Sequence, residues 1–244
     1  MPVYEYSPMW NRLFEGPAEL APLNAVLAVL HQAMSGRPAG SCVLTCHQIS
    51  AALHHLGFPA EPIAACATLY RTAGSFSEES DLGVWQRPPI VRPDGTTTGH
   101  MIVWAPSFAQ LIDPTLVQHE ILLSRAATNP TYSIPVCVPA PTDPEALPRE
   151  RLVARLDEDL YVSWLLQPDW TDAVNAALDE TLTLAAELGG LSLATQALEV
   201  LRRLAAEREL GPPDALSARL GALLAGTAHL PAMPDEVPSQ LWNP

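Results

Sequence analysis

Apolar residues spaced three and four positions apart mark one buried helical face in the segment that begins at Cys42. The residues on this face are Cys42, Cys46, Ile49, Leu53 and Leu56. A Pro- and Gly-rich run, 36–40, precedes the segment, and Gly57 with Pro59 just beyond it is a typical helix end. The pattern therefore predicts a loop that leads into a buried helix over 42–57, with Cys42 at its start.

The rest of the chain predicts a small sheet followed by further helices. The predicted strands cover 60–70, 99–104, 109–113 and 133–138. The predicted helices, besides 42–57, cover 17–34, 149–156, 169–188, 191–209 and 214–224. We interpret 71–89 as a long loop, Gly189-Gly190 as a break between two helices, and 160–166 as either a strand or more helix. The expected fold class is α+β, with a core over 1–142 and a mainly α-helical portion over 143–244 that packs on it.

Three residues that could act as a nucleophile, a base and an orienting carboxylate lie at the ends of predicted elements. A thiol at a helix start, as expected for Cys42, meets unpaired backbone N–H groups and the positive end of the helix dipole, and both favour the thiolate. His100 opens one strand of a predicted hairpin and Asp113 closes the other, so their side chains are expected at the same end of the sheet. A thiol nucleophile needs a base and a group that orients this base, and the three residues can supply these roles.

These residues carry a resemblance to a known superfamily. Cys42 is followed by Ala-Leu-His-His-Leu-Gly-Phe-Pro-Ala at 52–60, then by Gly-His-Met-Ile-Val at 99–103 and Leu-Ile-Asp-Pro-Thr at 111–115. In kind and order they resemble the transglutaminase-like superfamily, which shares its core with papain-type cysteine proteases. The resemblance covers about 41–115 and implies a nucleophile helix packed on a small antiparallel sheet. It also implies acyl transfer, in which His100 deprotonates Cys42, Asp113 holds the imidazole tautomer, and water or an amine accepts the acyl group.

The implied mechanism needs further residues around the triad. The oxyanion would be stabilised by the Cys42 backbone N–H and one upstream donor, for which Gln32 and Asn24 are both candidates. The predicted loop over 71–89 holds the candidates for substrate contact, Trp85, Glu78 and Glu79. The expected substrate is a peptide, a protein or a small acyl compound, and the expected activity is that of a peptidase, an amidase or an amide-forming transferase.

Composition narrows the class of protein. The hydrophobic fraction of 48% fits a globular chain with a sizeable core, and the net charge of −14 argues against a nucleic-acid partner. All 13 basic residues are arginine, which is typical of a GC-rich genome and leads us to expect a bacterial source. We find no secretory signal at the N-terminus and no apolar run long enough for a bilayer, and the four cysteines are too few for a disulfide scaffold. We therefore expect a cytoplasmic protein with reduced thiols, without a membrane partner or a cofactor.

The sequence also allows other roles for these residues and for the chain. Cys42, Cys46 and His100 could bind zinc, with Cys66 or Asp113 as the fourth ligand, although we expect no metal. Cys46 is either a core residue or a resolving thiol for Cys42. The apolar faces of the C-terminal helices could pack on the core or form a homo-oligomer. The chain could also be an inactive transglutaminase-like scaffold that serves assembly, in which case the triad would be pulled apart.

Overall fold

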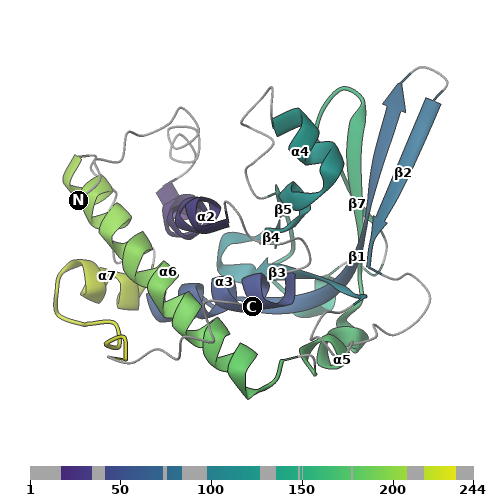
Figure 1. Ribbon diagram of the computed structural model, residues 1–244. Helices are drawn as coiled ribbons and strands as arrows, with labels where there is room; N and C mark the ends of the chain where they lie inside the picture. The colour runs from purple at the N-terminus through teal and green to yellow at the C-terminus, as the bar shows by residue number, and fades with distance from the viewer. Residues whose placement is uncertain are drawn as a thin grey trace.

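The computed structural model of the chain combines helices with an antiparallel sheet, so the fold class is α+β as predicted (Figure 1). The structure describes residues 18–34, 42–73, 76–83, 98–126, 136–147, 149, 151–176, 178–207 and 217–234. Within these residues, no helix has the length and apolar character needed to cross a membrane.

An antiparallel sheet, whose strand order differs from the order of the strands in the chain, forms the centre of the described residues. Its strands are β1 (Glu61–Ala73), β2 (Phe76–Leu82), β3 (His100–Ala105), β4 (Gln110–Asp113), β5 (Val136–Pro139), β6 (Leu152–Arg155) and β7 (Leu160–Leu166). They lie in the order β5-β4-β3-β1-β7-β6, with β2 paired to β1 as well, and all the pairs are antiparallel. The 13-residue β1 is the organising strand, because it pairs with β3 near its start, with β2 near its end and with β7 on the other side.

Helices α2 (Ala21–Met34), α3 (Cys42–Leu56), α6 (Glu180–Glu207) and α7 (Ala218–Leu224) gather on one side of the sheet (Figure 1). Their apolar residues form the first core together with Ala64 of β1 and with Met101 and Val103 of β3. Helix α3 lies in contact with both the sheet and α6, which explains why ten of its 15 residues are buried. The predicted buried helix at Cys42 is therefore confirmed, and it occupies the middle of this core.

A second core covers the opposite face of the sheet. It contains Trp104, Trp164, Leu69 and Val162 from the strands, and Leu116 and neighbouring apolar residues from the segment after β4. That segment contains a 3-10 turn, η3 (Leu116–Gln118), and the short helix α4 (Glu120–Ala126). Alternating residues of the strands supply the two cores, as the period of two requires.

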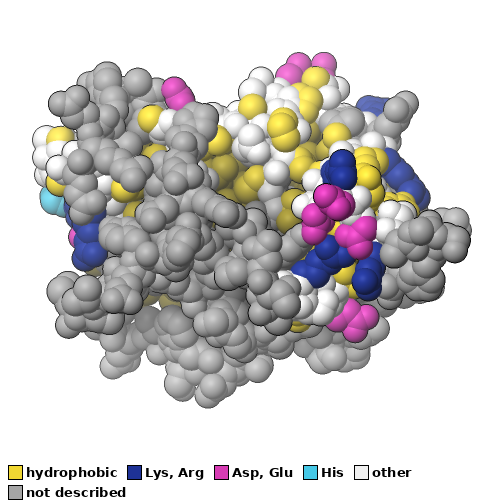
Figure 2. Space-filling model, turned by 90° about the horizontal axis from the view of Figure 1, so that it is seen from above, with side chains coloured by type: hydrophobic (Ala, Val, Ile, Leu, Met, Phe, Trp, Pro, Cys, Tyr) yellow, Lys and Arg dark blue, Asp and Glu magenta, His cyan; other side chains and the backbone are white. Residues whose placement is uncertain are grey.

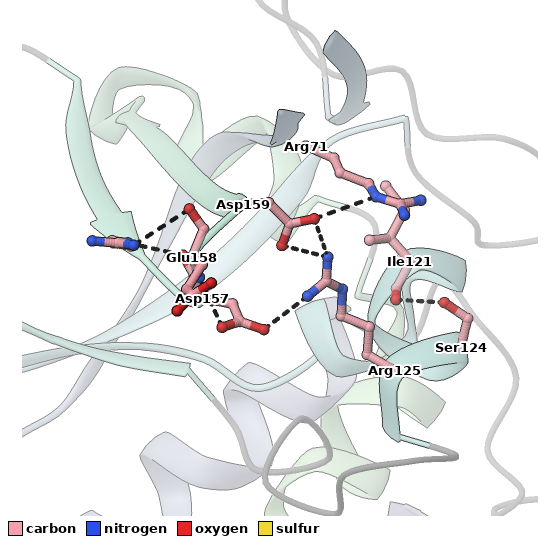
Figure 3. A network of polar contacts seen from close by, with 8 residues as sticks. Arg71, Ile121, Ser124, Arg125, Asp157, Glu158 and Asp159 are labelled. Atoms are coloured by element: carbon pink, nitrogen blue, oxygen red, sulfur yellow. Dashed lines mark hydrogen bonds and ion pairs between the residues drawn. The ribbon is translucent and has the colours of Figure 1, made fainter. Parts of the chain in front are cut away.

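Charged side chains hold α4 to the turn between β6 and β7. Arg125 donates to Asp157 at 2.8 Å and to both oxygens of Asp159 at 2.6 and 2.7 Å, while Arg71 of β1 lies 3.7 Å from Asp159 (Figure 3). The hydrogen bond from Arg125 is the main reason why the pKa of Asp159 is lowered. Arginine and acidic side chains are intermixed on this side of the surface (Figure 2). Such exposed pairs are screened by salt, so they fix the position of α4 more than they add stability.

Four sequence predictions about individual elements are wrong. The segment predicted as a helix over 149–156 contains strand β6, and the predicted loop over 71–89 contains the end of β1 and strand β2. The predicted helix over 169–188 is interrupted between α5 (Thr171–Asn175) and α6. Gly189 and Gly190 do not separate two helices, because α6 runs through both without a break. The segment 160–166, for which the sequence allowed a strand or more helix, is strand β7, which pairs with β1 near the middle of the sheet. The sheet therefore crosses the division at 142/143 that the sequence suggests.

Candidate active site

Cys42 lies at the first residue of α3, as the sequence predicts. It is 5% exposed, and its Sγ lies 3.9 Å from the carbonyl oxygen of Gly99, immediately before β3. A backbone N–H in the first turn of a helix has no intrahelical acceptor, so the end of α3 points unpaired N–H groups towards the thiol's surroundings. The arrangement provides a thiol at a positive helix end beside the start of β3.

His100 and Asp113 meet as the predicted hairpin requires. Strands β3 and β4 pair antiparallel with Val103 opposite Ile112, and a 3-10 turn over Pro106–Phe108 joins them. His100 Nε2 lies 2.8 Å from Asp113 Oδ2, and the two residues are 4% and 2% exposed. The hydrogen bond between the first residue of one strand and the last residue of the next confirms the predicted neighbourhood of the two side chains.

Three N–H groups point at the Asp113 carboxylate. Besides His100, the indole Nε1 of Trp164 donates to Oδ2 at 2.8 Å, and the backbone N–H of Leu116 donates to Oδ1 at 3.0 Å. A carboxyl group that only accepts hydrogen bonds is in its ionised form. Since the carboxylate needs a donor, the proton of a neutral His100 lies on Nε2, and Nδ1 is left as the base.

Cys42 lies close enough to the His100 ring to influence its protonation. Burial by itself disfavours the charged ring, but the Asp113 charge, the hydrogen bond to Asp113 and the hydrogen bond and charge of Cys42 together raise the pKa of His100 to about 10. The environment therefore favours a protonated imidazole between a carboxylate and a thiol. This is the charge arrangement that activates a cysteine nucleophile.

Cys46 lies one turn further along α3 and has a different environment. Its Sγ donates to the carbonyl oxygen of Met101 at 3.2 Å, the side chain is fully buried, and burial raises its pKa well above the ordinary value. A thiol held neutral in this way is a core residue. The described residues contain no group of three or more His, Cys, Asp or Glu side chains that could hold a metal ion, so nothing there supports the zinc alternative.

The structure brings together the three triad candidates, whereas the other candidate residues are described only in part. Asn24 is half-buried in α2, and Gln32 belongs to the same helix with a side chain outside the described residues. Glu78 and Glu79 lie in β2, not in a loop; the side chain of Glu78 is outside the described residues and that of Glu79 is exposed. Trp85 lies outside the described residues altogether.

Glu79 is far from the triad along β1. It pairs with Tyr70, whereas His100 pairs with Ala65, and five residues of extended strand span about 16 Å. Glu79 therefore lies away from the triad itself, and its contact with a substrate stays a prediction.

Two neighbours of the triad have no signal in the sequence. Trp164 reaches Asp113 from β7, which comes 51 residues later in the chain. Gly83, at the end of β2, has a φ of +93°, and a Cβ built there would lie 3.0 Å from the carbonyl oxygen of Ala65 and 3.1 Å from the Cβ of His100. Only pairing across the sheet creates these contacts, so neither residue forms part of a local motif.

A Gly83→Ala substitution is expected to disturb His100. The new methyl group would meet the side chain of His100 and the backbone of β1, and a positive φ costs an alanine about 1 kcal/mol by itself. We expect a lower melting temperature and a slower reaction of Cys42 with iodoacetamide. Gly226→Ala is the matched control, because Gly226 has a φ of +72° with no atom within 4 Å of the new Cβ. Equal Cys42 reactivity in the two variants would contradict the prediction.

No family model, curated protein or solved structure matches the chain.

Proposed function

We propose that the chain is a cysteine-dependent acyl-transfer enzyme in which Cys42 is the nucleophile, His100 the base and Asp113 the orienting carboxylate. The observation that carries the proposal is the buried His100–Asp113 hydrogen bond of 2.8 Å, with Cys42 near enough to the same ring to help raise its pKa. A ring held between a carboxylate and a thiol can take the thiol proton and return it to a leaving group.

The proposed reaction proceeds through a thioester. The Cys42 thiolate attacks a carbonyl carbon, the C=O electron pair moves to oxygen, and the backbone N–H of Cys42 helps to stabilise the oxyanion. When the tetrahedral intermediate collapses, the bond to the leaving group breaks and protonated His100 gives its proton to that group. Neutral His100 then takes a proton from water or an amine as this acceptor attacks the thioester, and the Cys42 thiolate leaves.

The fold is compatible with a papain- or transglutaminase-like core, and we propose this kinship. Its support is that Cys42 opens a helix packed on an antiparallel sheet, while His100 and Asp113 lie on adjacent strands of that sheet. In this proposal the catalytic core extends past 142, because β7 supplies Trp164 to the carboxylate. The substrate class remains a peptide, a protein or a small acyl compound, with water or an amine as the acceptor.

Selective labelling of Cys42 tests the proposal. We expect a thiol-directed activity probe at pH 7 to modify Cys42 at least about tenfold faster than Cys137, although Cys137 is exposed and Cys42 is buried. Peptide mapping by mass spectrometry measures the rate at each site, and Cys42→Ala identifies the adduct. Faster modification of Cys137 would reject the enzyme.

An inactive scaffold is the second candidate function. Its support is the burial of all three triad side chains, since Cys42, His100 and Asp113 are each at most 5% exposed. A scaffold would leave Cys42 unmodified by the probe in the folded protein and equally reactive with Cys137 after unfolding. The two functions therefore give opposite labelling patterns.

A further inference from the structure

Trp164 shares an acceptor with His100. Its indole Nε1 donates to Asp113 Oδ2 at 2.8 Å, and His100 Nε2 lies at the same distance from the same oxygen. Trp164 is 2% exposed and is packed in the second core beside Val162 and Leu166 of its own strand. The neighbouring residue Ile112 points into the first core, so the alternation of β4 turns Asp113 towards the face on which Trp164 lies.

The three donors leave the carboxylate little freedom to rotate. Oδ2 accepts two N–H groups, from β3 and from β7, and Oδ1 accepts the backbone N–H of Leu116. Without the indole, Oδ2 would keep a single donor, and the carboxylate could turn about its last side-chain bond. A carboxylate that turns away from the His100 ring stabilises the imidazolium less.

We propose that Trp164 is a positioning residue for the acyl transfer, whose indole N–H holds Asp113 Oδ2 in the orientation that aligns His100 with Cys42. The proposal rests on the proposed function for its role in catalysis, while its structural content can be tested separately. In this proposal β7 is part of the active site, and Trp164 has a role in catalysis in addition to its packing in the second core.

Trp164→Phe tests the proposal, because it keeps the aromatic packing and removes the N–H. The titratable groups that face His100 are Asp113 from β4 and Cys42 from α3, and the substitution leaves both in place. We expect the titration midpoint of His100, followed by NMR of ¹⁵N-labelled histidine, to fall by about half a pH unit or more. The carboxylate, once free to turn away from the ring, stabilises the imidazolium less. An unchanged or higher midpoint would overturn the proposal.

Trp104→Phe is the matched control. Trp104 is also buried in the second core, and its indole donates at 2.9 Å to a backbone carbonyl, that of Pro141, instead of to Asp113. A merely structural effect of removing a buried indole N–H would lower the melting temperature in both variants and leave His100 unchanged. A shift of His100 in Trp164→Phe but not in Trp104→Phe supports positioning, and equal shifts reject it.

The wild-type protein provides a test that does not depend on a folded variant. The ¹⁵N–¹H resonance of the Trp164 indole is expected to move with the same midpoint as His100, because both N–H groups share one oxygen. If the chemical shift of the indole resonance does not change with the protonation of His100, the proposal is overturned. Failure of the proposed function gives a different result: Cys42 would resist the thiol probe, while the linked titration of Trp164 and His100 would persist.

Discussion

His100→Ala is expected to slow the alkylation of Cys42 at pH 6 by about a hundredfold. An ordinary thiol titrates near pH 8.5, so at pH 6 less than about 1% of it is thiolate. In the proposed enzyme, the ring of His100, whose pKa is raised to about 10, stabilises a thiolate at the neighbouring Cys42. The rate with iodoacetamide, measured at Cys42 by peptide mapping, reports this stabilisation directly.

The pH profile gives the sharper form of this prediction. Burial opposes the charge on His100, but Asp113 and Cys42 outweigh it and raise the pKa to about 10, so the ring stays protonated as the pH falls from 9 to 6. We therefore expect the wild-type rate to change little over this range. In His100→Ala, the rate should fall about tenfold per pH unit below about pH 8.5.

His119→Ala is the control for this experiment. The His119 ring bonds to Ser80 at 2.8 Å and accepts the backbone N–H of Ile121 at 3.2 Å, so these two contacts link β2 to α4. Its profile should match the wild type. If His100→Ala instead kept the flat wild-type profile, the helix end alone would account for the thiolate, and His100 would have no part in activating Cys42.

The local parts of the site could be predicted from the sequence. Cys42 begins a helix whose apolar spacing and terminal Gly57 are visible within 16 residues, and the hairpin that joins His100 to Asp113 is similarly short. In both cases one short stretch of chain determines the element and the position of its end. The adjacency of His100 and Asp113 then follows from antiparallel pairing alone.

The remaining parts depend on pairing between distant segments. Leu152, Ala154 and Leu156 alternate along β6 and pack against the second core. The same five-residue stretch also fits a helical turn, so the apolar pattern does not distinguish a strand from a helix. Nothing near Trp164 indicates its hydrogen bond to Asp113, because the contact arises from the order of the strands in the sheet. Sequence order does not reveal that β7 lies beside β1.

The predicted break at Gly189-Gly190 is wrong because glycine has two opposite uses in helices. It weakens a helix, which favours a break, but it also allows a second backbone to approach closely. Here the second use applies. A Cβ at Gly190 would lie 2.4 Å from the Cβ of Ala51 in α3, 3.0 Å from the carbonyl oxygen of Gln48 and 3.1 Å from the backbone nitrogen of Ala52.

Gly190→Ala is therefore expected to destabilise the protein by about 2–3 kcal/mol, the range of overpacked cores. At an unconstrained helical site the same change would stabilise by about 0.5–1 kcal/mol, so the sign of the effect identifies the close approach. Two of the three nearest atoms belong to the backbone of α3, and they can separate from α6 only if the helix moves. Chemical denaturation with urea measures the free energy of unfolding.

Gly189→Ala is the matched control in the same helix. Its new Cβ would meet the side chain of Gln48, which hydrogen-bonds to the carbonyl of Ala185 at 3.4 Å. We expect a smaller cost than for Gly190→Ala, because the new Cβ meets a side chain that can adjust and no backbone atom of α3 is among its three nearest neighbours. Equal destabilisation by the two substitutions would mean that the backbone contact of Gly190 is not the tighter one.

A double substitution locates the clash. Ala51→Gly removes the methyl group nearest to the new Cβ and by itself costs about 0.5–1 kcal/mol as a glycine in a helix. Combined with Gly190→Ala, it should recover at least about 1 kcal/mol relative to the sum of the two single effects, because residues in contact are not additive. Strict additivity would contradict the contact. Because α3 begins at Cys42, Gly190→Ala should also slow the labelling of that thiol, and the double variant should restore part of the rate.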